Sequence, residues 1–154
     1  MTFQPGGGHQ PGSATLLGEL LGRGQRATLR ARGGSMWPFL RDGDVVTLAP
    51  LTAPILLGEV LLARRGDELV LHRAVRLTEG GPVLRGDALP REDGVFPAAQ
   101  LLGRVVRLRR AGHAGRGYPP ARLFALAMAP ACRLWLRVAR RARSRRSRET
   151  PALR

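Results

Sequence analysis

Short apolar runs separated by turn signals constrain most strongly what this chain can fold into. Between residues 27 and 108, runs rich in Val and Leu recur at intervals of about eight to twelve residues. Gly, Pro or Asp residues separate them, and no repeat relates one run to another. This spacing predicts a mainly β, antiparallel fold, with strands over residues 27–32, 45–48, 60–63, 69–77, 83–85 and 101–108.

The ends of the chain have a different composition from its middle. Residues 1–12 are rich in Gly and Pro and are expected to be disordered, and a short helix is expected to start at Ser13 and to end at Gly22–Gly24. We assign residues 13–108 to one domain and the Gly/Arg-rich residues 109–119 to a linker. Residues 120–154 are expected to be a basic, apolar helical segment and tail, interrupted by Pro130.

All 26 basic residues of the Lys and Arg class are arginine, and the formal net charge is +15. The single cysteine excludes an internal disulfide, and three histidines at positions 9, 72 and 113 lack metal-ligand spacing. We therefore expect no metal and no cofactor. The start of the chain has no basic segment followed by an apolar one, so a secretory signal is not expected.

The longest uncharged apolar stretch, residues 123–132, is too short for the roughly 18 residues that a membrane span needs. Eight arginines and no acidic residue follow it over residues 133–148. This tail can be a solvated charge run, a contact with an anionic membrane surface, or a non-specific nucleic-acid contact, of which the last is least favoured. The expected location is peripheral membrane association or the cytoplasm.

The chemistry-bearing residues begin with a serine on a glycine-flanked turn, Gly33-Gly34-Ser35. A serine hydroxyl is a weak nucleophile until a neighbouring base takes its proton. Lysine is absent from the chain, and arginine stays protonated at any working pH, so the base must be histidine. His72 lies on an expected strand, and it should titrate through a pKa of about 6 to 7.

These residues lie in boxes that resemble those of the signal peptidase I-like serine peptidases. The family's nucleophile box is similar to the sequence Gly-Ser-Met-x-Pro-x-Leu, which continues here to Gly-Asp-x-Val. A second box, Leu-His-Arg-Ala-Val, falls where bacterial members carry Lys-Arg. The His-Arg pair is that of the archaeal, spore-former and endoplasmic-reticulum branch. The matched boxes occupy, in the family's order, residues 34–46, 58–61, 71–75, 84–88 and 102–106.

The resemblance implies a small antiparallel β fold and a role for each site residue. Ser35 would be the nucleophile, His72 the general base and Asp87 the orienting acid, with Asp93 as a competing carboxylate. Gly34 would present a backbone N–H to the oxyanion, and Met36 would line the substrate groove. Ala88 and Leu89 stand where the family has amides, and Gly33 stands where many members have a hydroxyl residue. The transmembrane anchor of this branch is not expected.

Residues beside these are expected to play supporting parts. Arg73, next to the expected base, should pair with a carboxylate, and Asp42 and Asp44 should support the serine turn. The resulting expectation is a serine endopeptidase that cleaves a peptide or protein precursor through an acyl-enzyme. The alternative is an inactive member of the same fold that binds a membrane or nucleic acid through its arginine-rich tail.

Overall fold

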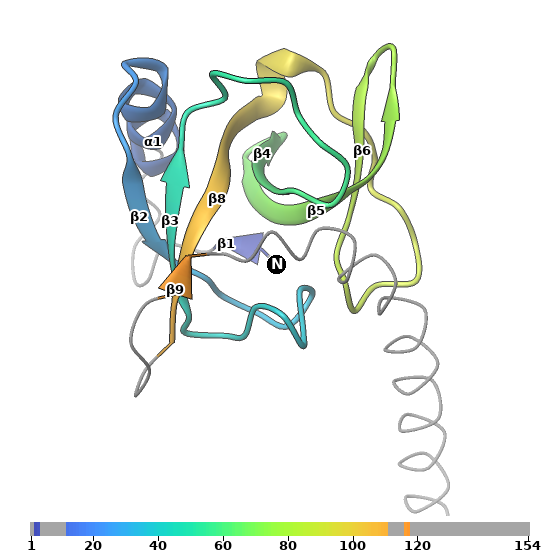
Figure 1. Cartoon of the computed structure of the whole chain (residues 1–154), viewed down its shortest axis with the longest axis horizontal. Coiled ribbons are helices and arrows are strands. Elements are labelled where there is room, and N and C mark those ends of the chain that lie inside the picture. Colours follow the sequence, from blue (N-terminus) through green and yellow to red (C-terminus); the bar gives the residue numbers. More distant parts are fainter. Residues whose placement is uncertain (1, 4–11, 111–115, 118–154) are drawn as a thin grey trace, which may run out of the picture.

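The structure, a computed structural model, describes residues 2–3, 12–110 and 116–117. The chain folds into one antiparallel sheet with a short helix beside it (Figure 1). The helix is α1 (Gly12–Gly22), and a single 3₁₀ turn, η1 (Ala98–Gln100), precedes the last long strand. The strands are β1 (Thr2–Phe3), β2 (Ala27–Arg30), β3 (Val45–Ala49), β4 (Val60–Arg65), β5 (Glu68–Thr78), β6 (Gly81–Arg85), β7 (Gly94–Val95), β8 (Leu101–Arg109) and β9 (Arg116–Gly117).

The path through the sheet is β2-β3-β8-β4-β5-β6-β7, and every pairing along it is antiparallel. The strand β1 pairs with β5, and β9 pairs with β8. Figure 1 shows the sheet curling through β4 and β5. Both the mainly β class and the N-terminal helix agree with the sequence prediction, and all six expected strands are present with ends shifted by at most two residues.

Two short strands lie in segments for which the sequence predicts no strand. Residues 2–3, placed in a disordered N-terminus, form β1, and residues 116–117, placed in a linker, form β9. The expected helical segment and tail, residues 120–154, lie outside the described residues. No helix among the residues that the structure describes is long and apolar enough to cross a membrane.

The central strands β4 and β5 are buried on both faces, which explains their unbroken apolar runs. Alternate residues of β4 enter two separate hydrophobic clusters: Val60 and Leu62 join one, and Leu61 and Ala63 join the other. The same alternation applies to Leu69 and Val70 of β5. A polar residue on these strands is therefore surrounded by core and needs a partner.

The helix α1 packs on β8 through a small residue. Gly103 has the main-chain oxygen of Ala49 and the side chain of Leu21 next to it, and an added Cβ would lie 2.9 Å from that oxygen and 3.1 Å from a Leu21 methyl group. Leu21 is 2% exposed and belongs to the larger cluster. The box Leu-Gly-Arg-Val-Val at residues 102–106 thus contains a glycine because a larger residue would separate the helix from the sheet.

Candidate active site

Ser35 lies on the connection between β2 and β3, whose ends are held together at their base. Ala31 N–H donates to the main-chain oxygen of Asp44 at 2.7 Å, and Gly43 N–H donates to that of Ala31 at 2.9 Å. Gly33 has a φ of +83°, in the left-handed region that favours glycine. The turn therefore requires a glycine at position 33.

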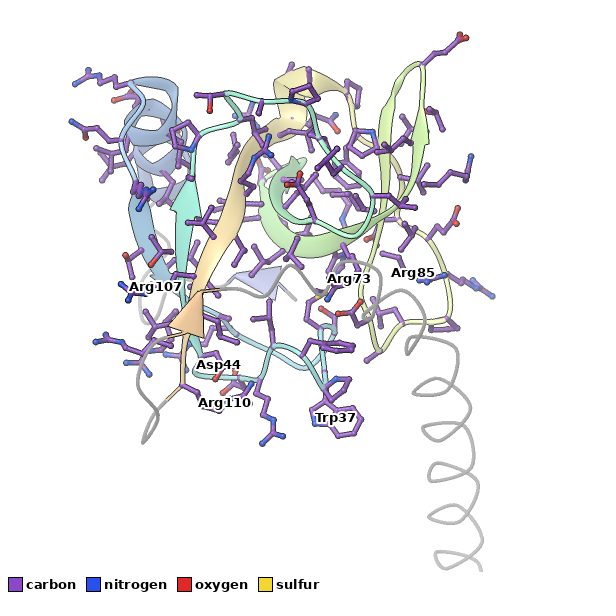
Figure 2. The ribbon with its side chains drawn as sticks, viewed as in Figure 1. Trp37, Asp44, Arg73, Arg85, Arg107 and Arg110 are labelled. Atoms are coloured by element: carbon purple, nitrogen blue, oxygen red, sulfur yellow. The ribbon has the colours of Figure 1, made fainter. Side chains whose placement is uncertain are left out.

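The base of this connection is fixed by two carboxylates. Asp42 accepts Gly33 N–H at 2.8 Å, and buried Asp44 accepts Arg41 N–H at 2.8 Å. Arg110 donates to both Asp44 oxygens, at 2.9 and 2.7 Å, and Figure 2 shows these two side chains together below β8. Burial alone would raise the pKa of Asp44, but the hydrogen bonds from Arg110 and Arg41 leave it lowered. The predicted supporting role of both aspartates is confirmed.

Met36 fixes the other side of the turn and does not line a groove. Its side chain is 0% exposed and packs in the larger hydrophobic cluster together with Leu40. Leu40 N–H donates to the Met36 main-chain oxygen at 3.0 Å. This single turn places both apolar side chains in the core. The expectation that Met36 contacts substrate was wrong, because the core takes up the whole side chain.

The serine and the histidine are brought together although they lie 37 positions apart in the sequence. Ser35 Oγ and His72 Nε2 are 2.9 Å apart, within hydrogen-bond distance. His72 comes from the middle of β5 and is 3% exposed, whereas Ser35 remains partly exposed. A hydroxyl that solvent or a ligand can reach thus faces an imidazole that the core shields.

The other ring nitrogen of His72 contacts Asp93, which lies just before β7. His72 Nδ1 forms a short hydrogen bond with Asp93 Oδ2. Because a carboxylate only accepts, Nδ1 carries the proton in the neutral ring, and Nε2 is left as the acceptor for the Ser35 hydroxyl. Asp93 is held in turn by Arg65, at 3.1 Å, and by its own N–H, which donates to the Leu84 oxygen at 2.8 Å.

The expected orienting acid, Asp87, lies elsewhere. Its two carboxylate oxygens accept Arg73 Nε at 2.8 Å and Arg73 Nη2 at 2.6 Å, and both side chains are nearly fully buried. The assignment of Asp87 as the residue that orients His72 is therefore wrong, and Asp93 holds that place. The expectation that Arg73 pairs with a carboxylate is confirmed.

The Arg73–Asp87 pair attaches the Ser35 turn to the sheet. Arg73 also donates to the Gly58 oxygen at 2.8 Å, and its guanidinium lies 5.3 Å from the centre of the Phe39 ring. Figure 2 shows Arg73 above the connection that bears Trp37. Asp87 thereby holds the turn at residues 86–89 beside the serine connection.

That second turn contacts Ser35 directly. Ala88 N–H donates to the Ser35 main-chain oxygen at 2.8 Å. A Cβ at Gly86 would lie 2.7 Å from the same oxygen, closer than real Cβ atoms approach. Glycine in the Gly86-Asp87 pair is thus required for the close approach, and a backbone N–H supplies a hydrogen bond that needs no amide side chain at position 88.

Gly34 precedes the serine and is exposed, with open space where a Cβ would lie. Its main-chain oxygen accepts Trp37 N–H at 3.1 Å, which closes the first turn after the serine. The proposed donation from its own N–H to an oxyanion stays a prediction.

Burial lowers the pKa of His72 from 6.5 to about 4. The Asp93 carboxylate opposes this shift, and the positive charge of Arg65 adds a smaller lowering effect. The value expected from the sequence, about 6 to 7, is corrected downward. His72 is therefore neutral at neutral pH and ready to accept a proton.

No group of three or more His, Cys, Asp or Glu side chains in the described part of the chain could hold a metal ion. No protein-family model matches this chain, and no curated protein matches it. In the structure, a hydroxyl, a neutral imidazole and a carboxylate stand in the order that activates a serine.

Two substitutions distinguish the two aspartates. Asp93→Asn presents an amide to Nδ1, favours the proton on Nε2, and should lower the acylation of Ser35 by a fluorophosphonate by about 10³- to 10⁴-fold. Asp87→Asn leaves the buried Arg73 charge without its counter-ion, and it should lower the free energy of unfolding by about 3–5 kcal/mol. Urea unfolding and acylation rates on both variants measure this. An Asp87→Asn protein of full stability, or a fully active Asp93→Asn protein, would contradict the assignment.

The acylation rate should also depend on pH in a way set by His72. Only the neutral ring accepts the serine proton, so the rate should rise through pH about 4 and stay level above about pH 6. Because the folded pKa lies below the unfolded value, stability falls as pH falls from about 6.5 to about 4, and circular dichroism must confirm folding at each pH. A half-maximal rate near pH 6.5–7 would mean that burial does not control the base.

Proposed function

We propose that this chain is a serine endopeptidase of signal-peptidase type that cleaves a peptide or protein precursor. The observation that carries the proposal is the 2.9 Å contact between Ser35 Oγ and His72 Nε2, together with the bond from His72 Nδ1 to Asp93. The order of the sequence boxes around these residues supports the same class. The acid of the centre is Asp93 and not Asp87.

The chemistry follows from the positions of the protons. Ser35 Oγ attacks the scissile carbonyl carbon as its proton passes to His72 Nε2, and Asp93 stabilises the imidazolium that forms. The tetrahedral intermediate breaks its C–N bond, and His72 returns the proton to the leaving amine. A water molecule then loses its proton to His72 and attacks the acyl-enzyme, which releases the acid product and restores the Ser35 hydroxyl.

The proposal needs no cofactor, since the serine, imidazole and carboxylate supply every proton transfer. The developing oxyanion would be met by backbone N–H groups of the glycine-flanked turn, which is where the resemblance assigns Gly34. The resemblance also implies a preference for small residues such as Ala before the scissile bond. A precursor processed at the cytoplasmic side is the natural substrate class for a peripheral enzyme of this kind.

Serine-directed labelling tests the proposal. A fluorophosphonate should add to Ser35 in the full chain, located by peptide mass spectrometry, and the chain should cleave extended peptides with Ala before the scissile bond. Ser35→Ala and His72→Ala should each lower cleavage by at least about 10³-fold, and the double variant should lose no more, because the two residues act as one unit. Ser147→Ala and His113→Ala are matched controls. Undiminished labelling and cleavage in His72→Ala would contradict the proposal.

We further propose that residues 120–148 hold the enzyme on anionic membranes without spanning them. Each arginine near such a surface contributes about 1 kcal/mol, and the apolar residues before the arginines add to binding. Replacing Arg140, Arg141, Arg143, Arg145 and Arg146 with Gln in the full chain should lower binding to phosphatidylserine vesicles by at least about 100-fold at low salt, whereas Lys at the same positions should preserve it.

Sedimentation with phosphatidylserine and phosphatidylcholine vesicles measures this binding. Equal binding to both vesicle types would contradict the electrostatic account. Salt-sensitive binding to nucleic acid without vesicle binding would assign the tail to that partner instead.

A further inference from the structure

One face of the sheet, formed by β2, β3 and β8, carries exposed arginines. Buried and exposed residues alternate along β2 and the end of β8, and Arg30, Arg107 and Arg109 are exposed. Val45 pairs with both Arg30 and Arg109. Because paired residues of antiparallel strands direct their side chains to the same face, these two arginines lie on either side of Val45. Arg107 joins them, since it is two residues from Arg109 on the same strand.

The register also sets the spacing of these charges. Neighbouring strands lie about 4.8 Å apart, so the Cα atoms of Arg30 and Arg109 are about 10 Å apart. A rise of about 3.4 Å per residue places Arg107 about 7 Å from Arg109. Thr47 pairs with Thr28 and with Arg107, so two hydroxyl side chains lie in the same row. We call this set the cationic face: Thr28, Arg30, Val45, Thr47, Arg107 and Arg109.

The folded domain does not neutralise the cationic face. The strands β2, β3 and β8 contain no acidic residue. The two carboxylates of the adjoining Ser35 connection are engaged, since Asp44 binds Arg110 and Asp42 accepts Gly33 N–H. Among the residues that the structure describes, no carboxylate forms an ion pair with an arginine of this face. Its charge is therefore available to an anion from another molecule.

The side chains between the arginines indicate which kind of anion fits. Insertion into a membrane surface needs large exposed apolar side chains. Those of the described residues lie on other parts of the domain: Leu16, Leu56, Leu57, Leu77 and Val95. The face also has no aromatic ring on which a nucleic-acid base could stack. Arginine binds carboxylates in a bidentate geometry, so an acidic polypeptide fits this surface better than a membrane or a single-stranded nucleic acid.

The cationic face borders the connection that carries Ser35. This connection starts directly after Arg30, at the end of β2. Arg30 Nη1 donates to the main-chain oxygen of Gly43 at 3.2 Å, at the base of the connection. Figure 2 shows Arg107 and Arg110 at the same lower end of β8. A polypeptide whose reacting bond lies at Ser35 can therefore extend onto this face.

We propose that the cationic face binds an acidic segment of the polypeptide that this chain cleaves. The inference rests on the proposed peptidase function and adds the charge of the substrate to it. Side chains at alternate positions of an extended segment are about 7 Å apart, which matches Arg107 and Arg109. Such a segment contacts no reacting atom, so it should lower the KM of a substrate and leave kcat unchanged.

Peptide binding tests the face without catalysis. The arginine tail also attracts acidic peptides, so every sample is a full chain with Gln at positions 140, 141, 143, 145 and 146 and with Ser35→Ala. At low salt, acetyl-(Glu-Ser)6-amide should shift the NMR amide signals of β2, β3 and β8, whereas acetyl-(Gln-Ser)6-amide should not. Added salt should weaken this binding, because the arginines are exposed.

Two double variants locate the binding. Arg107→Gln/Arg109→Gln should weaken binding of the Glu peptide at least about fivefold, because two ion pairs are lost. Arg23→Gln/Arg64→Gln is the matched control, since it removes the same charge from two exposed positions outside β2, β3 and β8. The control should weaken binding less than about twofold.

Kinetics test the consequence for catalysis, with Ser35 restored. The substrate pair has Ala before the scissile bond and either a (Glu-Ser)3 or a (Gln-Ser)3 segment, placed before or after that bond in separate peptides. In at least one placement, the Glu peptide should have a KM at least about fivefold lower than the Gln peptide, at equal kcat. Arg107→Gln/Arg109→Gln should remove this difference, and the control variant should keep it. Fluorophosphonate labelling of Ser35 should be equal in all samples.

The outcomes separate the two proposals. If no sample is labelled or cleaves peptides, the peptidase function fails, while the binding measurements still decide whether the face takes an acidic segment. Equal binding of the Glu and Gln peptides, or binding that Gln at positions 107 and 109 leaves intact, would overturn the inference. Tighter binding of oligothymidylate or of phosphatidylserine vesicles that the same variant abolishes would overturn it in favour of that partner. An active enzyme with one KM for both peptides in both placements would show that substrates do not use this face.

Discussion

The buried ion pair between Arg73 and Asp87 is the interaction on which the geometry of the site depends. Arg73 is 1% exposed, and its guanidinium contacts Asp87, the Gly58 oxygen and the Phe39 ring. A buried pair of this kind contributes little net stability relative to apolar residues, but the loss of one partner is costly. Through these contacts the pair connects the turn at residues 86–89 and the Ser35 connection with β5.

His72 and Arg73 are adjacent on β5 and contact different parts of the site. His72 faces Ser35 and Asp93, and Arg73 faces Asp87 and the connection that carries the serine. Because β5 is packed between β4 and two hydrophobic clusters, neither side chain can move without disturbing the core. Burial of His72 has a second effect, since it lowers the pKa of the imidazole and keeps the ring neutral at neutral pH.

Much of the fold and the pairing of Ser35 with His72 could be predicted from the sequence. The apolar runs with glycine, proline and aspartate between them are local signals, and each produced a strand near its expected place. The absence of lysine left histidine as the base for a serine nucleophile, and the two side chains are in contact. The sequence patterns do not show that buried Arg73 pairs with Asp87 and that Asp93 is left to contact His72.

The errors follow from that limit. Asp87 follows a strand in a matched box, but in the folded chain its carboxylate contacts Arg73 and not His72. Asp93 contacts His72 because β7, which follows it, pairs with β6. Met36 follows Ser35, yet its apolar side chain is buried in the core. The strands β1, β7 and β9 have two residues each and form through pairing with other strands. Two residues are too few to show an alternating pattern in the sequence, so these strands could not be predicted.

The measurement that tests the central claim most directly is the tautomer of His72 in the full chain at neutral pH, read from the ¹⁵N NMR signals of its imidazole ring. The account predicts a neutral ring with the proton on Nδ1, bonded to Asp93, and an unprotonated Nε2 facing Ser35. This state should persist in a variant with a changed tail and should be lost in Asp93→Asn. A proton on Nε2 with a bare Nδ1, or an imidazolium at neutral pH, would contradict the account.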